Sequence, residues 1–360
     1  MKKIISLPFF LLLVSFSLNS CKESFVKGQQ PAGSVVDSSY VRADCNAVYY
    51  WKTRFLLNDD EESFLKKHAV GRMYVRLFDV DLQSDVLKGQ DEIVPVGTLV
   101  FYEPVPDSVE IVPVVFITVR ALEMMEAKQG ISSYADKLVT RILNMADFND
   151  LGQVHEIQLD CDWTESTQEA FNRLFREVKA LLAGRHILLS STIRLHQLRQ
   201  NPPPVDRGVL MLYNTGPVQL ASTENSILNE RDVKPYLAGK PVHFDLPLDF
   251  AYPTYGWGVW FRDGKFSGLL HHTDYSDATR YVPEADGMLR VRAEHVLEGH
   301  LLKVGDRIRK ESSPYETVAA VKKLVQDAFL DPHHSNILYH LDAQNLFNYS
   351  PDEIDSLFAL

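Results

Sequence analysis

The sequence has few of the residues that metal and redox chemistry require. Its 360 residues include three cysteines, and no Cys-x-x-Cys pair or Cys/His spacing typical of zinc is present. No glycine-rich phosphate loop follows an early strand, which argues against an open dinucleotide-binding sheet. We therefore expect no metal site and no cofactor.

Positive charge is also scarce. The chain carries 37 Lys and Arg against 48 Asp and Glu, for a net charge of -11. Loss of residues 1–20 would remove two lysines and no acid, leaving 35 basic and 48 acidic residues, or -13. This balance does not favour nucleic acid or an anionic lipid surface as a partner.

Apolar runs long enough to span a bilayer are missing after the N-terminus. There, Lys2 and Lys3 precede an apolar run at 4–16, and Leu18-Asn-Ser-Cys21 follows. This pattern resembles a bacterial lipoprotein signal, which implies cleavage before Cys21, lipidation of its thiol and a lipid-anchored place in the cell envelope, at the outer membrane or facing the periplasm. A plain secretory signal is the alternative. We expect a signal peptide at 1–20 and a lipidated, flexible tether at 21–43.

The other two cysteines leave two interpretations open. A disulfide between Cys45 and Cys161 is compatible with an oxidising compartment. Cys161 also lies on the apolar side of its predicted strand, which favours packing as a small hydrophobic residue.

The most informative stretch is 155–164, His-Glu-Ile-Gln-Leu-Asp-Cys-Asp-Trp-Thr. Apolar residues alternate with Glu156, Gln158, Asp160 and Asp162, so in a strand these four polar side chains share one face. Buried carboxylates are costly, and such a row is typical of a site that binds a ligand or moves protons. The following 164–169 segment predicts a helix start with a Ser166–Glu169 capping box.

Strand patterns recur along the rest of the chain. Eight of them begin near residues 48, 72, 111, 154, 186, 209, 242 and 337, mostly separated by helical patterns. The count predicts one (β/α)8 TIM barrel over 44–360, with a β-rich subdomain at 252–313 inserted between strands seven and eight. A doubly wound open sheet is the alternative.

Three motifs resemble family 18 glycoside hydrolases, the chitinases and endo-β-N-acetylglucosaminidases. They are Asp160-Cys-Asp162-Trp163, Met211-Leu-Tyr213-Asn214, and Leu246-Pro247 with Pro253-Thr-Tyr255-Gly-Trp-Gly258. The resemblance implies a barrel that cleaves a β-linked N-acetylated glycan such as chitin, peptidoglycan or an N-glycan. In that family a Glu protonates the leaving oxygen, and a neighbouring Asp orients the N-acetyl group of the substrate. The phrases around Asp160 and Arg194 also resemble a family of bacterial barrel lipoproteins.

This chain departs from that family at the acid. Thr164 stands where the resemblance implies the catalytic Glu, Ile157 replaces the first Asp of the motif, and Asn214 replaces the strand-six Asp. We therefore keep two hypotheses: hydrolysis with Asp162 orienting the substrate and Asp160, Glu156 or Glu165 as acid, and glycan binding without catalysis. A structural envelope protein is a third.

The candidate binding residues lie at predicted strand ends. Aromatic faces there suit sugar rings, although core packing also explains each one. Asp160 and Asp162 could instead form structural ion pairs with Arg76 or Arg194. The candidates for substrate binding are Tyr49, Trp51, Arg76, Asp79, Gln158, Trp163, Arg194, His196, Tyr213, Asn214 and Tyr255.

Overall fold

Eight parallel strands close into a barrel. The computed structural model describes residues 40–360 except 86–88, 240 and 272–273. Strand β1 pairs in parallel with both β3 and β18, so the ring is closed. In ring order the strands are β1 (Asn46–Tyr50), β18 (Asn336–Tyr339), β10 (Leu248–Pro253), β9 (Arg207–Met211), β8 (Leu188–Ile193), β7 (Glu156–Asp160), β6 (Glu110–Ile117) and β3 (Val70–Asp85). The predicted (β/α)8 fold is confirmed.

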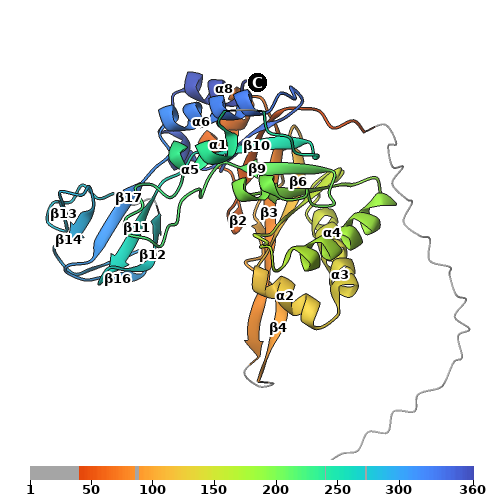
Figure 1. Ribbon diagram of the computed structural model, residues 1–360, viewed down its shortest axis with the longest axis horizontal. Coiled ribbons are helices and arrows are strands. Elements are labelled where there is room, and N and C mark those ends of the chain that lie inside the picture. The colour runs from red at the N-terminus through yellow and green to blue at the C-terminus, as the bar shows by residue number, and fades with distance from the viewer. Residues whose placement is uncertain (1–39, 86–88, 240, 272–273) are drawn as a thin grey trace, which may run out of the picture. The chain divides into compact units, whose positions relative to one another are not determined.

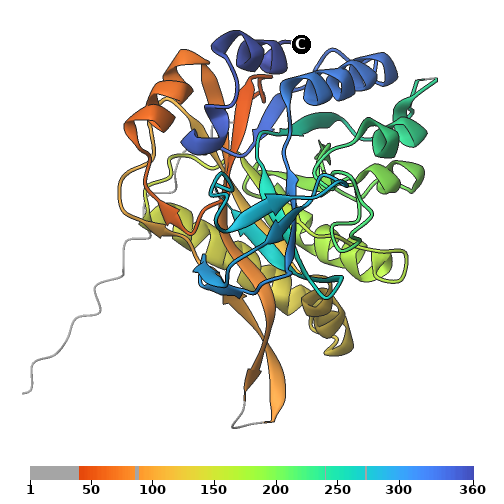
Figure 2. The same cartoon turned by 90° about the vertical axis from the view of Figure 1, so that its left-hand side faces the viewer.

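Helices surround the ring, as Figures 1 and 2 show. In α4, Phe171, Leu174, Phe175 and Val178 recur at helical spacing and are buried. No helix in the described part of the chain is long and apolar enough to cross a membrane. The helices are α1 (Asp59–Lys67), α2 (Val119–Ala127), α3 (Ile131–Phe148), α4 (Gln168–Ala183), the 3-10 helix η1 (Leu195–Arg199), α5 (Glu230–Leu237), α6 (Tyr315–Ala328), α7 (Ala343–Leu346) and α8 (Pro351–Phe358).

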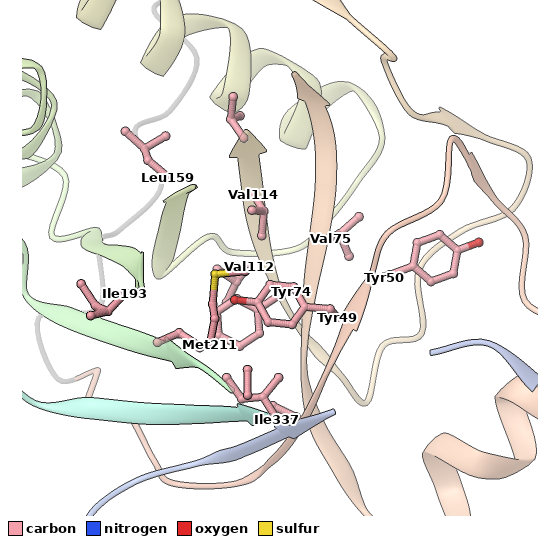
Figure 3. Close-up of a cluster of buried hydrophobic side chains, with 14 of the residues drawn as sticks. Tyr49, Tyr50, Tyr74, Val75, Val112, Val114, Leu159, Ile193, Met211 and Ile337 are labelled. Carbon is pink, nitrogen blue, oxygen red and sulfur yellow. The ribbon is translucent and has the colours of Figure 1, made fainter. Parts of the chain in front are cut away.

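Inside the ring, side chains alternate between the barrel interior and the helices. Tyr49 and Tyr74 point into the interior with Met211, whereas Tyr50 points away from it (Figure 3). The rings of Tyr49 and Tyr74 lie 5.0 Å apart and are fully buried. The interior is therefore a packed core, and a ligand can reach the barrel only at its ends.

Most strands outside the ring form separate sheets. Between β10 and β18, five antiparallel strands in the order β12-β11-β17-β14-β13 make the predicted inserted subdomain, with β15 and β16 as a separate pair. Buried Trp260, Leu270 and Ile308 belong to its own core. Its strands are β11 (Trp257–Arg262), β12 (Lys265–His271), β13 (Tyr281–Pro283), β14 (Leu289–Val291), β15 (His295–Leu297), β16 (His300–Leu302) and β17 (Arg307–Glu311). A further parallel pair joins β2 (Arg54–Phe55) to β5 (Val100–Phe101).

Two local predictions were wrong. The seventh ring strand begins at Leu248 rather than near 242, because prolines 241 and 247 flank that stretch and lack amide donors. Helix α4 starts at Gln168 without a side-chain cap, so the predicted capping box is absent.

Strand β3 extends beyond the ring. Its last part, from Asp79 to Asp85, pairs antiparallel with β4 (Gln90–Val96).

Candidate functional site

Two acids follow one another at the carboxyl end of β7. Asp160 is 5% exposed and accepts a 2.6 Å hydrogen bond from Oγ1 of Thr192 on β8. Asp162 lies two residues further on, where Nε and Nη2 of Arg194 donate to its two carboxylate oxygens at 2.6 and 3.0 Å. The predicted ion pair with Arg194 therefore forms at Asp162. We call this end of the ring the mouth.

The two acids differ in their electrostatic setting. Burial, with the neighbouring charge of Asp162, raises the pKa of Asp160 to about 6, although Arg194 and Thr192 oppose the shift. Asp162 is more exposed, at 45% of its side chain, and carries the guanidinium contact. Asp160 is thus a carboxyl group that still holds a proton in part of the molecules near neutral pH.

A cluster of aromatic rings surrounds Tyr339 at the end of β18. Its ring stacks on Tyr213 at 4.4 Å between centroids and lies 5.5 to 5.8 Å from Tyr49, Tyr255 and Trp51. Burial raises the pKa of the Tyr339 hydroxyl. Four charged side chains also influence this pKa: Asp160, Arg76, Arg194 and Asp79. Tyr339 therefore belongs to the aromatic cluster and is close enough to these charged groups to interact with them electrostatically.

Only some of these rings are open to a ligand. Tyr49 and Tyr213 are 0% and 2% exposed, so they form the floor behind the others. Trp51 and Tyr339 are partly exposed. Trp163 is buried and packs on Phe171 of α4 at 5.3 Å, away from the cluster.

A second ion pair lies at the mouth on β3. Arg76 donates through Nε to Asp79 at 2.7 Å and through Nη2 to the other oxygen of the same carboxylate. Its guanidinium also lies 5.7 Å from the ring centre of Trp51. Arg76 therefore pairs with Asp79 on its own strand rather than with Asp160 or Asp162.

The first two polar residues of β7 lie away from the mouth. Gln158 accepts a 2.6 Å hydrogen bond from the Tyr49 hydroxyl in the middle of the barrel. Glu156, at the amino end of the strand, accepts a 2.7 Å hydrogen bond from Nε of Arg42. Because both side chains have buried protein partners, neither is in position to contact a ligand held at the mouth.

The loop after β7 holds the position that the resemblance assigns to the acid. Thr164 is exposed. Its Oγ1 lies 2.9 Å from Oγ of Ser166, and its backbone N–H donates a hydrogen bond to Oγ1 of Thr167. Glu165 is exposed in the same turn. Neither residue is held against the mouth by a side-chain contact with Asp160 or Asp162 in the described structure.

Two further predicted residues border the mouth. Asn214 follows β9 with a φ of 52° and accepts a 2.7 Å hydrogen bond from Tyr255. His196 is exposed in η1, beyond the end of β8 at Ile193, and partial burial together with the charge of Arg194 lowers its pKa.

Sequence reasoning missed Tyr339 and Thr192. Tyr339 closes the last strand predicted from the sequence, so the rule applied to the other strand ends would have found it. Thr192 belongs to a strand pattern in which nothing local distinguishes it from the neighbouring serines. Its role depends on the pairing of β8 with β7.

The cysteine and metal predictions concern other parts of the chain. Cys45 and Cys161 are free thiols, and Cys161 is buried, whereas Cys21 lies outside the described residues. Within the described ranges, no group of three or more His, Cys, Asp or Glu side chains is placed to hold a metal ion.

Comparison with known proteins finds similarity of structure. No family model matches the sequence, and no curated protein matches it. The spore cortex-lytic enzyme SleL of Bacillus cereus superposes with a TM-score of 0.47 at 15% identity, covering 89% of this chain and 75% of that one. A chitinase from Chromobacterium violaceum gives 0.46 at 13%, covering 85% and 98%.

A family 18 chitinase from Cycas revoluta in complex with (GlcNAc)3 gives a TM-score of 0.45 at 10% identity and covers 87% of this chain and 99% of that one. At such identities the similarity concerns the arrangement of strands and helices, which the closed ring already establishes.

Proposed function

We propose that the mouth binds a glycan. The observation that carries the proposal is Tyr339, whose partly exposed ring lies beside Trp51 and within the field of Asp160 and Arg194. Aromatic faces pack on the apolar faces of sugar rings. Fixed charged groups form hydrogen bonds with the hydroxyl and amide groups of a sugar, with the carboxylate accepting and the guanidinium donating. The combination suits a neutral saccharide.

The Asp162–Arg194 pair supports recognition of a polar substituent. Both oxygens of Asp162 are oriented by the guanidinium, and the carboxylate remains 45% exposed on its side chain. A preorganised carboxylate loses little entropy on binding, because Arg194 already holds it in place. Such a carboxylate can accept a hydrogen bond from the N–H of an N-acetyl group.

The test is calorimetric titration with chitin oligosaccharides, peptidoglycan fragments and N-glycans. We expect Tyr339→Ala and Asp162→Asn each to weaken binding about tenfold, because each removes one stacking or charge-assisted contact. Phe148→Ser is the matched control, since that aromatic side chain is 89% exposed on α3. Absence of binding to every glycan, or equal affinity in all variants, would refute the proposal.

Hydrolysis is the second candidate, and the raised pKa of Asp160 favours it. A carboxyl group with a pKa of about 6 can donate a proton to a leaving oxygen near neutral pH. The expected result is release of shorter products, lost in Asp160→Asn and retained in Glu165→Gln, with a rate that falls as pH rises above about 6. Product release that persists in Asp160→Asn would exclude Asp160 as the acid and leave Glu165.

Anchoring in the bacterial envelope is a separate proposal that depends on residues 1–21 alone. The lysines, the apolar run and the small residues before Cys21 support lipidation of its thiol. In cells fed a labelled fatty acid, the wild-type chain should carry the label and sediment with membranes. A Cys21→Ser chain that is labelled equally would contradict lipidation at this residue.

A further inference from the structure

Gly97 lies directly against the guanidinium of Arg76. This glycine follows β4 and has a φ of +56°, in the left-handed region that favours glycine. A Cβ atom at this position would lie 2.7 Å from Nη2 of Arg76 and 3.6 Å from its Cζ, and the first of these distances is too short for atoms that are not bonded. The absence of a side chain at Gly97 therefore gives the guanidinium its place.

The backbone that follows this glycine is held from two directions. The N–H of Leu99 donates a 2.7 Å hydrogen bond to the carbonyl of Leu77 on β3. From α3, Nη2 of Arg141 donates to Oγ1 of Thr98 at 3.2 Å. Because this backbone is fixed, a side chain added at the glycine would displace the far end of the flexible Arg76 side chain instead.

A bulge in β3 brings Arg76 and Asp79 to the same side of the strand. The pairing of β3 with β6 skips Leu77, which lies between Arg76 and Phe78. In a regular strand, residues three apart point to opposite faces. The extra residue removes that opposition, and both carboxylate oxygens of Asp79 can then accept hydrogen bonds from Arg76.

The position of Arg76 affects a ring that is open to a ligand. Its guanidinium lies 5.7 Å from the ring centre of Trp51, a distance at which a cation and an aromatic ring attract each other. Trp51 is partly exposed, whereas only 10% of the Arg76 side chain is exposed. Arg76 therefore acts mainly by orienting its neighbours, Trp51 and Asp79.

We propose that Gly97 is a positioning residue of the mouth: it holds the Arg76 guanidinium against Asp79 and Trp51 without contacting the ligand itself. The inference rests on the proposed glycan binding and adds a residue to that site. A larger residue at position 97 would move the guanidinium, leaving Trp51 without its cation and the Asp79 carboxylate without its ion partner. The mouth would then bind a glycan less tightly.

The first measurement needs no ligand. The fluorescence of Trp51 is obtained as the difference between each chain and the same chain carrying Trp51→Phe. We expect Gly97→Ala to change the Trp51 emission, because the neighbouring guanidinium moves. The matched control is Gly89→Ala, which has a similar φ of +64° directly before β4 and no atom within 4 Å of the added Cβ. Trp51 emission that is the same in Gly97→Ala as in Gly89→Ala would overturn the proposal.

The second measurement is titration with the tetramer of N-acetylglucosamine. Gly97→Ala should weaken binding about fivefold, and Gly89→Ala should leave it unchanged. In a chain that already carries Arg76→Ala, Gly97→Ala should cause no further loss, because the group that it displaces is absent. A further loss in that chain, or equal affinities of the two glycine variants, would also overturn the proposal.

The two measurements separate this proposal from the proposed function. If the wild-type chain does not bind the tetramer, glycan binding fails for this sugar, and the Trp51 emission still decides whether Gly97 positions Arg76. If Gly97→Ala does not fold, the same comparison is made between Gly97→Asn and Gly89→Asn, because asparagine tolerates a positive φ better than alanine does.

Discussion

Both ends of the barrel carry ion pairs between arginine and acidic side chains, but the pairs are buried at one end and partly exposed at the other. At the amino end, Arg42 contacts Glu156 at 2.7 Å and Asp249 at 2.5 Å, and both acids are at most 1% exposed. At the mouth, Asp162 and Arg194 pair with side chains that are 45% and 21% exposed. The same strand β7 begins in one arrangement and ends beside the other.

This difference separates a structural network from a candidate site. The amino-end acids have partners for their charges: Asp249 also contacts Arg207 at 3.1 Å and accepts from the N–H of Ser335 at 2.7 Å. Removing one member of a buried network leaves the others uncompensated. The mouth retains an exposed carboxylate and partly exposed rings, which are free to meet a ligand.

The largest expected effect is at the amino end. Arg42→Ala leaves Glu156 and Asp249 buried without their main partner, and we expect a loss of about 3–5 kcal/mol in the free energy of unfolding. Urea denaturation measures the change. The matched control is Arg194→Ala, which should cost about 1 kcal/mol or less because water can solvate Asp162. Equal losses in the two variants would contradict the comparison.

A smaller and pH-dependent effect is expected at Asp160. Its pKa rises from 3.8 to about 6 on folding, so the folded chain binds this proton more tightly than the unfolded chain. The contribution is stabilising below pH 3.8 and is lost as pH rises through about 6. Relative to wild type, Asp160→Asn should gain up to about 3 kcal/mol between pH 4 and 7.

The measurement is the difference in unfolding free energy between wild type and Asp160→Asn at each pH, in which the effects of carboxylates remote from Asp160 cancel. Asparagine can still accept the Thr192 hydrogen bond. A difference that does not change with pH would show that Asp160 titrates alike in the folded and unfolded chains.

An intermediate loss is expected between the two ends. Tyr49→Phe removes the buried hydroxyl that donates a 2.6 Å hydrogen bond to Oε1 of Gln158, and it leaves that amide oxygen without this partner. We expect a cost of about 1–2 kcal/mol in chemical denaturation. The control for loss of a tyrosine hydroxyl outside the barrel interior is Tyr50→Phe, because the Tyr50 hydroxyl bonds backbone groups of the 54–56 segment and not Gln158. A loss of less than about 0.5 kcal/mol in Tyr49→Phe would contradict the buried contact.

The smallest effect on stability is expected in the loop beyond the mouth. Thr164→Glu places a carboxylate at an exposed position, where the threonine hydroxyl lies within hydrogen-bonding distance of Ser166 and Thr167. Melting temperature should change by an amount equivalent to about 0.5 kcal/mol. A loss of several kcal/mol would mean that the loop is more tightly packed than its exposure indicates.

Much of the barrel could be predicted from the sequence, because hydrophobic periodicity is a local property. The alternation around Glu156, Gln158 and Asp160 predicted one strand with three polar groups on one face, and all three side chains are buried inside the ring. The seventh strand was misplaced because the 242–247 stretch, Val-His-Phe-Asp-Leu-Pro, also alternates apolar and polar residues and contains a β-branched valine, whereas the true strand contains no β-branched residue.

The site was only partly accessible to the same reasoning. Residues on one face of a strand can lie at opposite ends of a barrel, so the row on β7 could not say which acid would meet a ligand. Arg42 contacts Glu156 from 114 positions away, and no local pattern records that distance. Thr192 reaches Asp160 across 32 positions through the pairing of adjacent strands.

The sequence by itself determined the kinds of elements, their order and the acid-rich strand at the centre, since these follow from side-chain periodicity over a few residues. Tertiary structure alone decided that Asp162 pairs with Arg194, that Glu156 belongs to a buried network, and that the ring of Tyr339 stacks on Tyr213. The physical reason is ring closure: it brings the last strand beside the first and places each side chain in a field made by distant residues.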